Sequence, residues 1–210
     1  MTPGPYLVYK CPKCGKFSFR GSLRSGNTIG AELFSDGKRI APMLPEFPSI
    51  TKCKNCKLFY WLKSENKIGE FYRHEADKKW NDAYKAEFLT VNEYDEAINS
   101  KVYTNEKEKI FLRTKLWQAM HDKIRWRENF DIPEDDKELY EKNCKALIEI
   151  LNINEIEGKI MIAELNRNLG KFIECKNILE TINNDKYIWI KKILEIECNK
   201  SNQKVISLIQ

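Results

Sequence analysis

Four cysteines near the N-terminus form two Cys-x-x-Cys pairs: Cys11 and Cys14, then Cys53 and Cys56. Each pair can fold into a tight turn that directs two sulfur atoms at one ion, and two such turns complete a tetrahedral shell of four thiolates. Gly15 follows the first pair and suits a turn residue with positive φ, whereas Lys57 occupies the equivalent position after the second pair. Because four cysteines fill the shell and leave no position for a substrate, the pattern predicts a structural zinc site.

Other chemistries use the same residue type. Iron accepts the same four-thiolate shell, so the sequence alone leaves zinc and iron open, and we expect zinc. A thioredoxin-like redox site needs one Cys-x-x-Cys in a βαβ setting, whereas this chain has two pairs and no such setting. Structural disulfides fit poorly with a reducing cytoplasm. We expect the other three cysteines to be buried free thiols on helices: Cys144, Cys175 and Cys198.

The sequence offers no assembled set of catalytic residues. The only histidines are His74 and His121, and neither completes a metal-ligand or triad pattern. We expect a surface or hinge position for His74 and packing within a helix for His121. The segment Ser25–Gly30 matches neither the phosphate-binding nor the dinucleotide-binding pattern. The sequence therefore predicts a protein that is not an enzyme and has no small-molecule substrate, while ligand binding by the insertion 22–45 stays open.

Basic residues are concentrated around the two cysteine turns. The first 73 residues hold 13 basic and 5 acidic side chains, whereas the remainder of the chain is mildly acidic. Part of this positive charge can offset the negative charge of a zinc tetrathiolate. It also makes a polyanion a possible partner, through Lys10, Lys13, Lys16, Arg20, Arg24, Lys38, Arg39, Lys52, Lys54 and Lys57, with Phe17, Phe19 and Tyr60 available for stacking on bases.

Short strands must hold the two cysteine turns in place. Apolar residues in 6–9, 16–19 and 59–62 predict strands beside the turns, and 29–34 and 38–41 flank a hairpin signal at Asp36-Gly37. A β unit of this size buries little apolar surface, so we expect the metal to provide much of its stability. These features predict a zinc ribbon over residues 1–69, with a β insertion between its two knuckles.

From about Glu70 the apolar spacing becomes helical, which predicts a helical domain over residues 70–210. We expect a helix over 71–89 with Trp80 and Tyr84 facing inward, and a second one that begins with a Thr90–Glu93 capping box. Further helices are expected near 105–127, 133–151, 160–169 and 187–198. The predicted fold class is therefore α+β, a small zinc-ribbon β domain followed by an all-α, tetratricopeptide-like domain.

The stretch 155–188 has the residue spacing of a tetratricopeptide helix hairpin. The residues that carry the pattern are Ala163, Gly170, Phe172, Cys175 and Leu179. Lys159 replaces the usual Trp of the first helix. A solenoid needs about three repeats, and only one is visible here, so an ordinary αα-hairpin is the alternative.

Taken whole, the chain resembles a group of uncharacterised bacterial proteins that join an N-terminal four-cysteine zinc ribbon to tetratricopeptide-like helices. The segments that carry the resemblance are Cys11–Gly15, Ser25–Thr28, Ser35–Lys38, Ala41–Pro45 and the hairpin around Gly170. The resemblance implies metal binding and protein interaction, and it brings no known activity with it.

Two functions fit these features. We favour a zinc-binding, non-catalytic adaptor or scaffold whose helical domain binds another protein or a peptide, because helix hairpins form concave surfaces. The alternative is a nucleic-acid-binding zinc ribbon that uses the basic N-terminal domain. A single basic face in the structure would favour nucleic acid, whereas scattered lysines would favour the adaptor.

The sequence also bears on location. The first residues lack the basic and apolar regions of a signal peptide. No apolar run approaches the roughly 20 residues that span a bilayer. We therefore expect a cytoplasmic protein that has no membrane partner.

Overall fold

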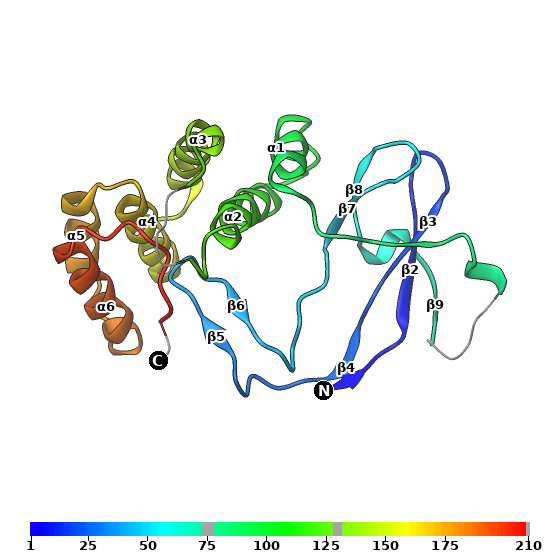
Figure 1. The fold of residues 1–210 in the computed structure, drawn as a ribbon, viewed down its shortest axis with the longest axis horizontal. Helices are drawn as coiled ribbons and strands as arrows, with labels where there is room; N and C mark the ends of the chain where they lie inside the picture. Colours follow the sequence, from blue (N-terminus) through cyan, green and yellow to red (C-terminus); the bar gives the residue numbers. More distant parts are fainter. Residues whose placement is uncertain (73–77, 128–131, 209–210) are drawn as a thin grey trace. The chain divides into compact units, whose positions relative to one another are not determined.

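The computed structural model describes residues 1–72, 78–127 and 132–208, so His74 lies outside the described residues. The chain forms two compact units. The ribbon unit comprises residues 1–31 and 40–102, and the helical unit comprises residues 32–39 and 103–210. A small β region followed by helices confirms the predicted α+β class (Figure 1). Residues 32–39, which lie between the two cysteine pairs in the sequence, belong with the helices.

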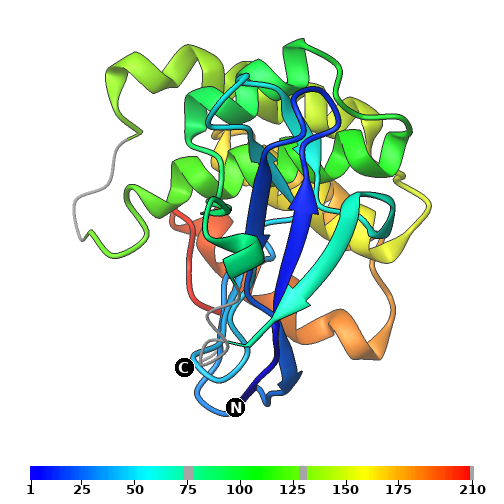
Figure 2. The same ribbon diagram turned by 90° about the vertical axis from the view of Figure 1, so that its right-hand side faces the viewer.

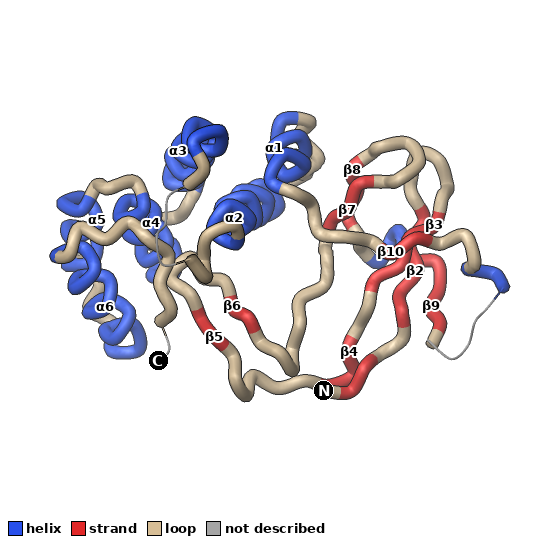
Figure 3. The backbone as a smooth tube through the Cα atoms, viewed as in Figure 1, coloured by secondary structure: helices blue, strands red, loops and turns tan. Residues whose placement is uncertain are grey.

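A four-stranded sheet forms the centre of the ribbon unit. Its strand order is β10 (Tyr84–Lys85), β3 (Phe17–Arg20), β2 (Tyr6–Lys10) and β9 (Lys67–Phe71). β2 is antiparallel to both of its neighbours, and β10 runs parallel to β3. Figure 2 shows β2, β3 and β9 side by side, and Figure 3 places β10 next to β3. The expected strands at 6–9 and 16–19 are thereby confirmed as β2 and β3.

Two smaller antiparallel pairs complete the β structure of this unit. β7 (Ile50–Lys52) pairs with β8 (Phe59–Trp61), and β1 (Thr2–Pro3) pairs with β4 (Leu23–Ser25). Each cysteine pair therefore lies in the turn of an antiparallel hairpin, the first between β2 and β3 and the second between β7 and β8. Each hairpin turn therefore presents one pair of cysteines.

The short helix α1 (Val91–Asn99) belongs to the ribbon unit. The Thr90 side chain accepts a hydrogen bond from the backbone of Glu93, and the Glu93 carboxylate accepts one from the Thr90 backbone, so the predicted capping box is confirmed. The Lys52 ammonium lies 2.7 Å from the Glu96 carboxylate and ties α1 to β7. The Trp61 indole N–H donates to the Val102 carbonyl over 2.8 Å, which joins the end of this unit to β8.

The expected helix over 71–89 is wrong. The described part of this stretch contains the end of β9, a single 3-10 turn (Lys78–Trp80) and β10. The Trp80 ring packs edge-on against Phe17 at 5.4 Å and lies close over Gly69, where a Cβ atom would come within 2.6 Å of the ring. The aromatic residues therefore have helical spacing by coincidence, because their partners lie on the sheet.

The helical unit consists of five helices within the described residues. They are α2 (Glu106–Asp122), α3 (Glu134–Ile150), α4 (Ile156–Asn168), α5 (Phe172–Glu180) and α6 (Ile188–Asn199). α2 packs against α3, α4 against α5, and α5 against α6 (Figure 1). None of the described helices is long and apolar enough to cross a membrane.

The hairpin of α4 and α5 has the predicted features. Gly170 has φ +74° directly after α4 and lets the chain reverse. Ala163, Cys175 and Leu179 lie in one buried cluster between the helices. The hairpin itself is confirmed, whereas the tetratricopeptide interpretation stays a prediction.

The segment 32–39 forms a tight turn flanked by β5 (Glu32–Leu33) and β6 (Arg39–Ile40). The predicted Asp36-Gly37 turn is confirmed, since Gly37 has φ +74°. The C-terminal segment pairs with this turn, because the Ser35 N–H donates to the Ile206 carbonyl over 2.9 Å and the Leu208 N–H donates to the Leu33 carbonyl over 2.7 Å. These backbone hydrogen bonds join segment 32–39 to the C-terminal segment of the helical unit.

A buried polar network anchors Asp36 to α2 and to the turn that follows it. The Asp36 carboxylate lies 2.9 Å from His121 Nδ1, and Arg125 donates to both of its oxygens, over 2.6 and 3.2 Å. His121 Nε2 lies 2.9 Å from the Tyr140 hydroxyl on α3. His121 therefore bridges the Asp36 carboxylate and the Tyr140 hydroxyl. His121 is fully buried, which confirms its expected packing within a helix.

This network predicts acid sensitivity of the helical unit. Burial alone would raise the pKa of Asp36, but the hydrogen bonds and charges of His121 and Arg125 lower it to about 2. Because the folded pKa is lowered, the carboxylate stabilises the unit above about pH 4, on the order of 2 kcal/mol, and this is lost as the pH falls towards 2. Urea unfolding between pH 6 and pH 2, followed by circular dichroism, should show this loss in the native chain and not in Asp36→Asn. Equal acid sensitivity of the two proteins would mean that protonation of Asp36 does not cause the loss of stability.

Candidate metal centre

The two cysteine turns have the same backbone geometry. In the first, the Gly15 N–H donates to the Cys11 carbonyl and the Cys11 N–H donates to the Lys16 carbonyl, each over 2.9 Å. In the second, the Lys57 N–H donates to the Cys53 carbonyl over 2.9 Å and the Cys53 N–H donates to the Leu58 carbonyl over 2.8 Å. The residue after each pair is left-handed, with φ 75° at Gly15 and 60° at Lys57. Two equivalent knuckles therefore face one another.

The four thiols gather at one point. Their sulfur atoms all lie within 4.8 Å of one another, and they form the only cluster of metal-ligating side chains among the described residues. Cys11 Sγ lies 3.6 Å from Cys56 Sγ, and Cys14 Sγ lies 3.5 Å from Cys53 Sγ. A tetrahedron with metal–sulfur bonds of about 2.3 Å has sulfur–sulfur edges of roughly 3.8 Å. The donor set and its spacing therefore fit one tetrahedrally bound metal ion.

Backbone N–H groups of the knuckles face the sulfur atoms. A hydrogen bond from the Lys16 backbone N–H lowers the pKa of Cys14 to about 6, which favours its thiolate form. Burial raises the pKa of Cys11 to about 12, against hydrogen bonds from the backbone of Cys14 and Lys13 that favour the thiolate. A bound cation would complete the ionisation, because the thiolate is the form that binds metal.

A chain of hydroxyl groups supports the centre from the sheet. The Tyr84 hydroxyl hydrogen-bonds to the Cys53 sulfur and to the Tyr60 hydroxyl. Tyr60 is in turn 2.7 Å from the Ser18 hydroxyl on β3. Partners of this kind orient metal ligands. The sequence did not reveal this role of Tyr84, because the residue spacing around it predicts a helix. Tyr60 is buried, so the expectation that Tyr60 stacks on bases is wrong.

The left-handed residue that follows the second cysteine is Gly15 in one knuckle and Lys57 in the other, which gives a matched pair of substitutions. Gly15→Ala should destabilise the ribbon unit by about 1 kcal/mol, because a Cβ atom strains a left-handed residue. Lys57→Gly removes such strain but loses chain entropy and the hydrogen bond of the Lys57 ammonium to the Lys54 carbonyl, so the expected change lies within about 1 kcal/mol of zero. Competition with a chelator should show weaker metal retention in Gly15→Ala than in Lys57→Gly, and Lys57→Gly should stay close to the native chain. A greater loss in Lys57→Gly than in Gly15→Ala would contradict the equivalence of the knuckles.

The basic side chains expected to bind a polyanion are divided between the two units. Lys38 and Arg39 belong to the helical unit, where Lys38 pairs with Asp122. The others belong to the ribbon unit: Lys10, Lys13, Lys16, Arg20, Arg24, Lys52, Lys54 and Lys57.

Several of the basic residues in the ribbon unit have partners within it. Lys52 pairs with acidic residues of α1, and Lys54 pairs with Glu87. Arg20 donates to the Tyr9 hydroxyl and the Pro48 carbonyl, over 3.0 and 3.1 Å. Much of the basic charge of this unit is therefore used to hold its own elements together.

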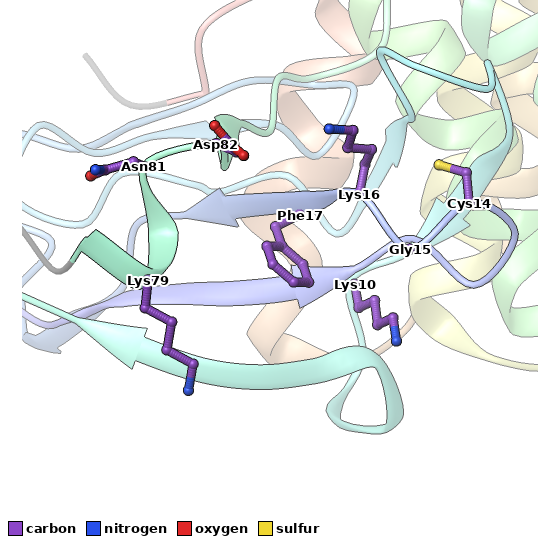
Figure 4. A pocket seen from close by; sticks show the side chains of 8 residues that line it. All are labelled: Lys10, Cys14, Gly15, Lys16, Phe17, Lys79, Asn81 and Asp82. Atoms are coloured by element: carbon purple, nitrogen blue, oxygen red, sulfur yellow. The ribbon is translucent and has the colours of Figure 1, made fainter.

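Lysines also surround an open hollow of about 680 Å³ beside the first knuckle (Figure 4). Lys10 and Lys16 come from the ends of β2 and β3, and Lys79 comes from the 3-10 turn, with Phe17 between them. A second hollow of about 430 Å³ shares Lys10 and Gly15 with the first and is also lined by Lys13. Asp82 and Glu65 add one negative charge to each lining.

No protein-family model matches the chain, and no match was found among curated proteins or among solved structures. The metal centre therefore stands on the residues and geometry described above.

Proposed function

We propose that the protein is a zinc-binding, non-catalytic adaptor or scaffold, in which zinc holds the ribbon unit together and the helical unit binds another protein or a peptide. The single observation that supports it best is the closed shell of four sulfur atoms on two equivalent knuckles. Such a shell suits a structural ion, because catalytic zinc keeps one position for water or substrate. Zinc is preferred to iron because zinc takes four-cysteine tetrahedral shells in ribbons of this kind.

Exposed apolar side chains on the last two helices support the partner-binding role. Trp189 and Ile196 on α6 are 42% and 51% exposed, and Ile173 on α5 is 74% exposed. Trp189 and Ile196 lie seven residues apart, so they project from one face of α6. Tryptophan is enriched among the residues that dominate binding energy in interfaces. This face is the part of the helical unit that we assign to the partner.

Site-specific crosslinking tests the proposal. A photoreactive phenylalanine analogue at position 189 in the zinc-loaded chain should capture a defined protein from a lysate of the source cells, and the same analogue at exposed Lys142 on α3 should not. Ile196→Asp should abolish the capture while the chain keeps its circular dichroism spectrum. Capture that is equal at both positions, or absent from both, would refute the proposed role of this face.

A second candidate function is binding of single-stranded nucleic acid by the ribbon unit. The observation in its favour is the pair of lysine-lined hollows that share Gly15, with Phe17 in the lining of one of them. Lysines contact phosphates, and the half-buried Phe17 ring can stack on a base with the part that Trp80 leaves open. Against it, the lysines also offset the negative charge of a zinc tetrathiolate.

Fluorescence anisotropy of labelled oligonucleotides separates the two functions. If the second candidate is correct, the zinc-loaded chain binds at about 50 mM salt and much more weakly at about 200 mM. Charge reversal to Glu at Lys10, Lys13 and Lys16 should then abolish binding, whereas the same change at Lys142, Lys171 and Lys192 of the helical unit should not. Absence of binding at low salt would eliminate this function and leave the adaptor.

A further inference from the structure

Two cysteines outside the metal centre lie next to each other in the core of the helical unit. Cys175 on α5 and Cys198 on α6 are 23 residues apart in the sequence, and the Cys198 thiol lies 3.1 Å from the Cys175 sulfur. Both are buried, with exposed fractions of 0% and 3%. They share one apolar cluster with Leu179 and Leu194. The sequence predicted buried free thiols at these positions but gave no sign that the two thiols meet.

The arrangement suits a pair of thiols and not a second metal site. No cluster of three or more ligating side chains other than the ribbon cysteines occurs among the described residues. Two sulfur atoms alone make a poor site for a metal that prefers four ligands. A disulfide needs a sulfur–sulfur bond of about 2.05 Å, so these sulfurs must approach by roughly 1 Å. Disulfide formation is therefore the chemistry open to this pair.

We propose that Cys175 and Cys198 form a reversible disulfide that joins α5 to α6. The oxidant is a small-molecule disulfide of the glutathione class. The thiolate of one cysteine attacks the oxidant, one small thiol leaves, and a mixed disulfide forms. The second cysteine then attacks the protein sulfur of the mixed disulfide and releases the second small thiol. In total the two protein thiols lose two electrons and two protons, and one small disulfide becomes two small thiols.

Burial sets the conditions under which this reaction occurs. Removal from water raises the pKa of both Cys175 and Cys198, so few thiolates exist while α6 is packed. The segment after α6 is also held, because the buried Arg167 guanidinium donates to the carbonyls of Asn202 and Lys204. The oxidant must therefore react when α6 opens locally, and the reaction is slow in the native chain and faster in mild urea.

Peptide mapping of the full-length, zinc-loaded chain tests the proposal without any substitution. The chain is incubated with mixtures of reduced and oxidised glutathione, quenched with acid, alkylated after denaturation and digested with trypsin. Lysines separate the three cysteines of the helical unit into different peptides. The expected product joins the Cys175 and Cys198 peptides and is lighter than their sum by two hydrogen atoms. Cys144 is an internal control, because it is buried in the same unit and should stay alkylated.

Thermal unfolding adds a second readout. A disulfide between the helices restricts the unfolded chain, so the oxidised protein should have a higher Tm than the reduced one, and Cys198→Ala should remove the difference. Recovery of Cys175 and Cys198 as separate alkylated peptides at every glutathione ratio would overturn the proposal. Crosslinks of Cys175 or Cys198 to Cys144 or to the ribbon cysteines, in the same amount as the Cys175–Cys198 crosslink, would overturn it as well. Such a result would mean that disulfide formation does not depend on the contact between Cys175 and Cys198.

Discussion

Replacing Asp36 with Ala is expected to destabilise the helical unit by about 3–5 kcal/mol, the range for a buried ion pair that loses one partner. The Asp36 side chain has no exposed surface, and it accepts hydrogen bonds from both His121 and Arg125. Its backbone carbonyl also accepts from the Gln118 amide over 3.1 Å. The substitution leaves the Arg125 charge buried, and it removes the carboxylate that faces His121 Nδ1.

Asp122 provides a matched control for this prediction. Its carboxylate accepts from Arg125 over 3.1 Å, but its side chain is 41% exposed. Asp122→Ala should therefore cost less than about 1 kcal/mol. Urea unfolding followed by far-ultraviolet circular dichroism measures both variants, because α2 to α6 supply most of the helix in the chain. If the two variants unfold at the same urea concentration, Asp36 does not anchor segment 32–39.

Removing the metal is expected to unfold the ribbon unit and to leave the helical unit folded. Cys11 and Cys53 are core residues of the ribbon unit, packed with Tyr9, Tyr60 and Leu62. Without an ion, four thiols remain side by side within a small β structure, and two of them are part of its core. In zinc-finger peptides the ion contributes about 10–16 kcal/mol of apparent binding energy, which is also folding energy. Loss of this contribution exceeds what a small sheet can compensate.

Limited proteolysis with trypsin reports on each unit separately. After treatment with a chelator, or in Cys53→Ser, cleavage should spread through the basic residues of the ribbon unit while a fragment that contains α2 to α6 persists. Cys144→Ser, which changes a buried cysteine of the helical unit, should keep the proteolytic pattern of the native ribbon. Protection of the ribbon unit after complete metal removal would contradict a structural role of the ion.

Turns and helix caps that are formed by residues close together in the sequence were predicted correctly. The two Cys-x-x-Cys turns, the Thr90–Glu93 capping box and the Asp36-Gly37 turn all occur as expected. Gly170 likewise ends α4. In each case the residues that form the turn or the cap lie within a few positions of one another, so the local sequence contains the information.

Features that depend on distant partners were missed. The spacing of Trp80 and Tyr84 suggested a helix, but Trp80 packs on Phe17 and Gly69, and β10 pairs with β3. The burial of Asp36 requires a histidine and an arginine more than 80 positions away. Contacts between residues so far apart produce no periodic pattern in the sequence. For the same reason, nothing in the spacing of Cys175 and Cys198 predicted their contact.

Native mass spectrometry of the freshly purified chain tests the central claim most directly, namely that the four ribbon cysteines bind one structural zinc ion. The expected result is one zinc per chain, with Cys11, Cys14, Cys53 and Cys56 protected from alkylation until the ion is removed, and no zinc in Cys56→Ser. A folded chain that carries iron, or one that carries no metal and leaves all four thiols open to alkylation, would contradict the claim.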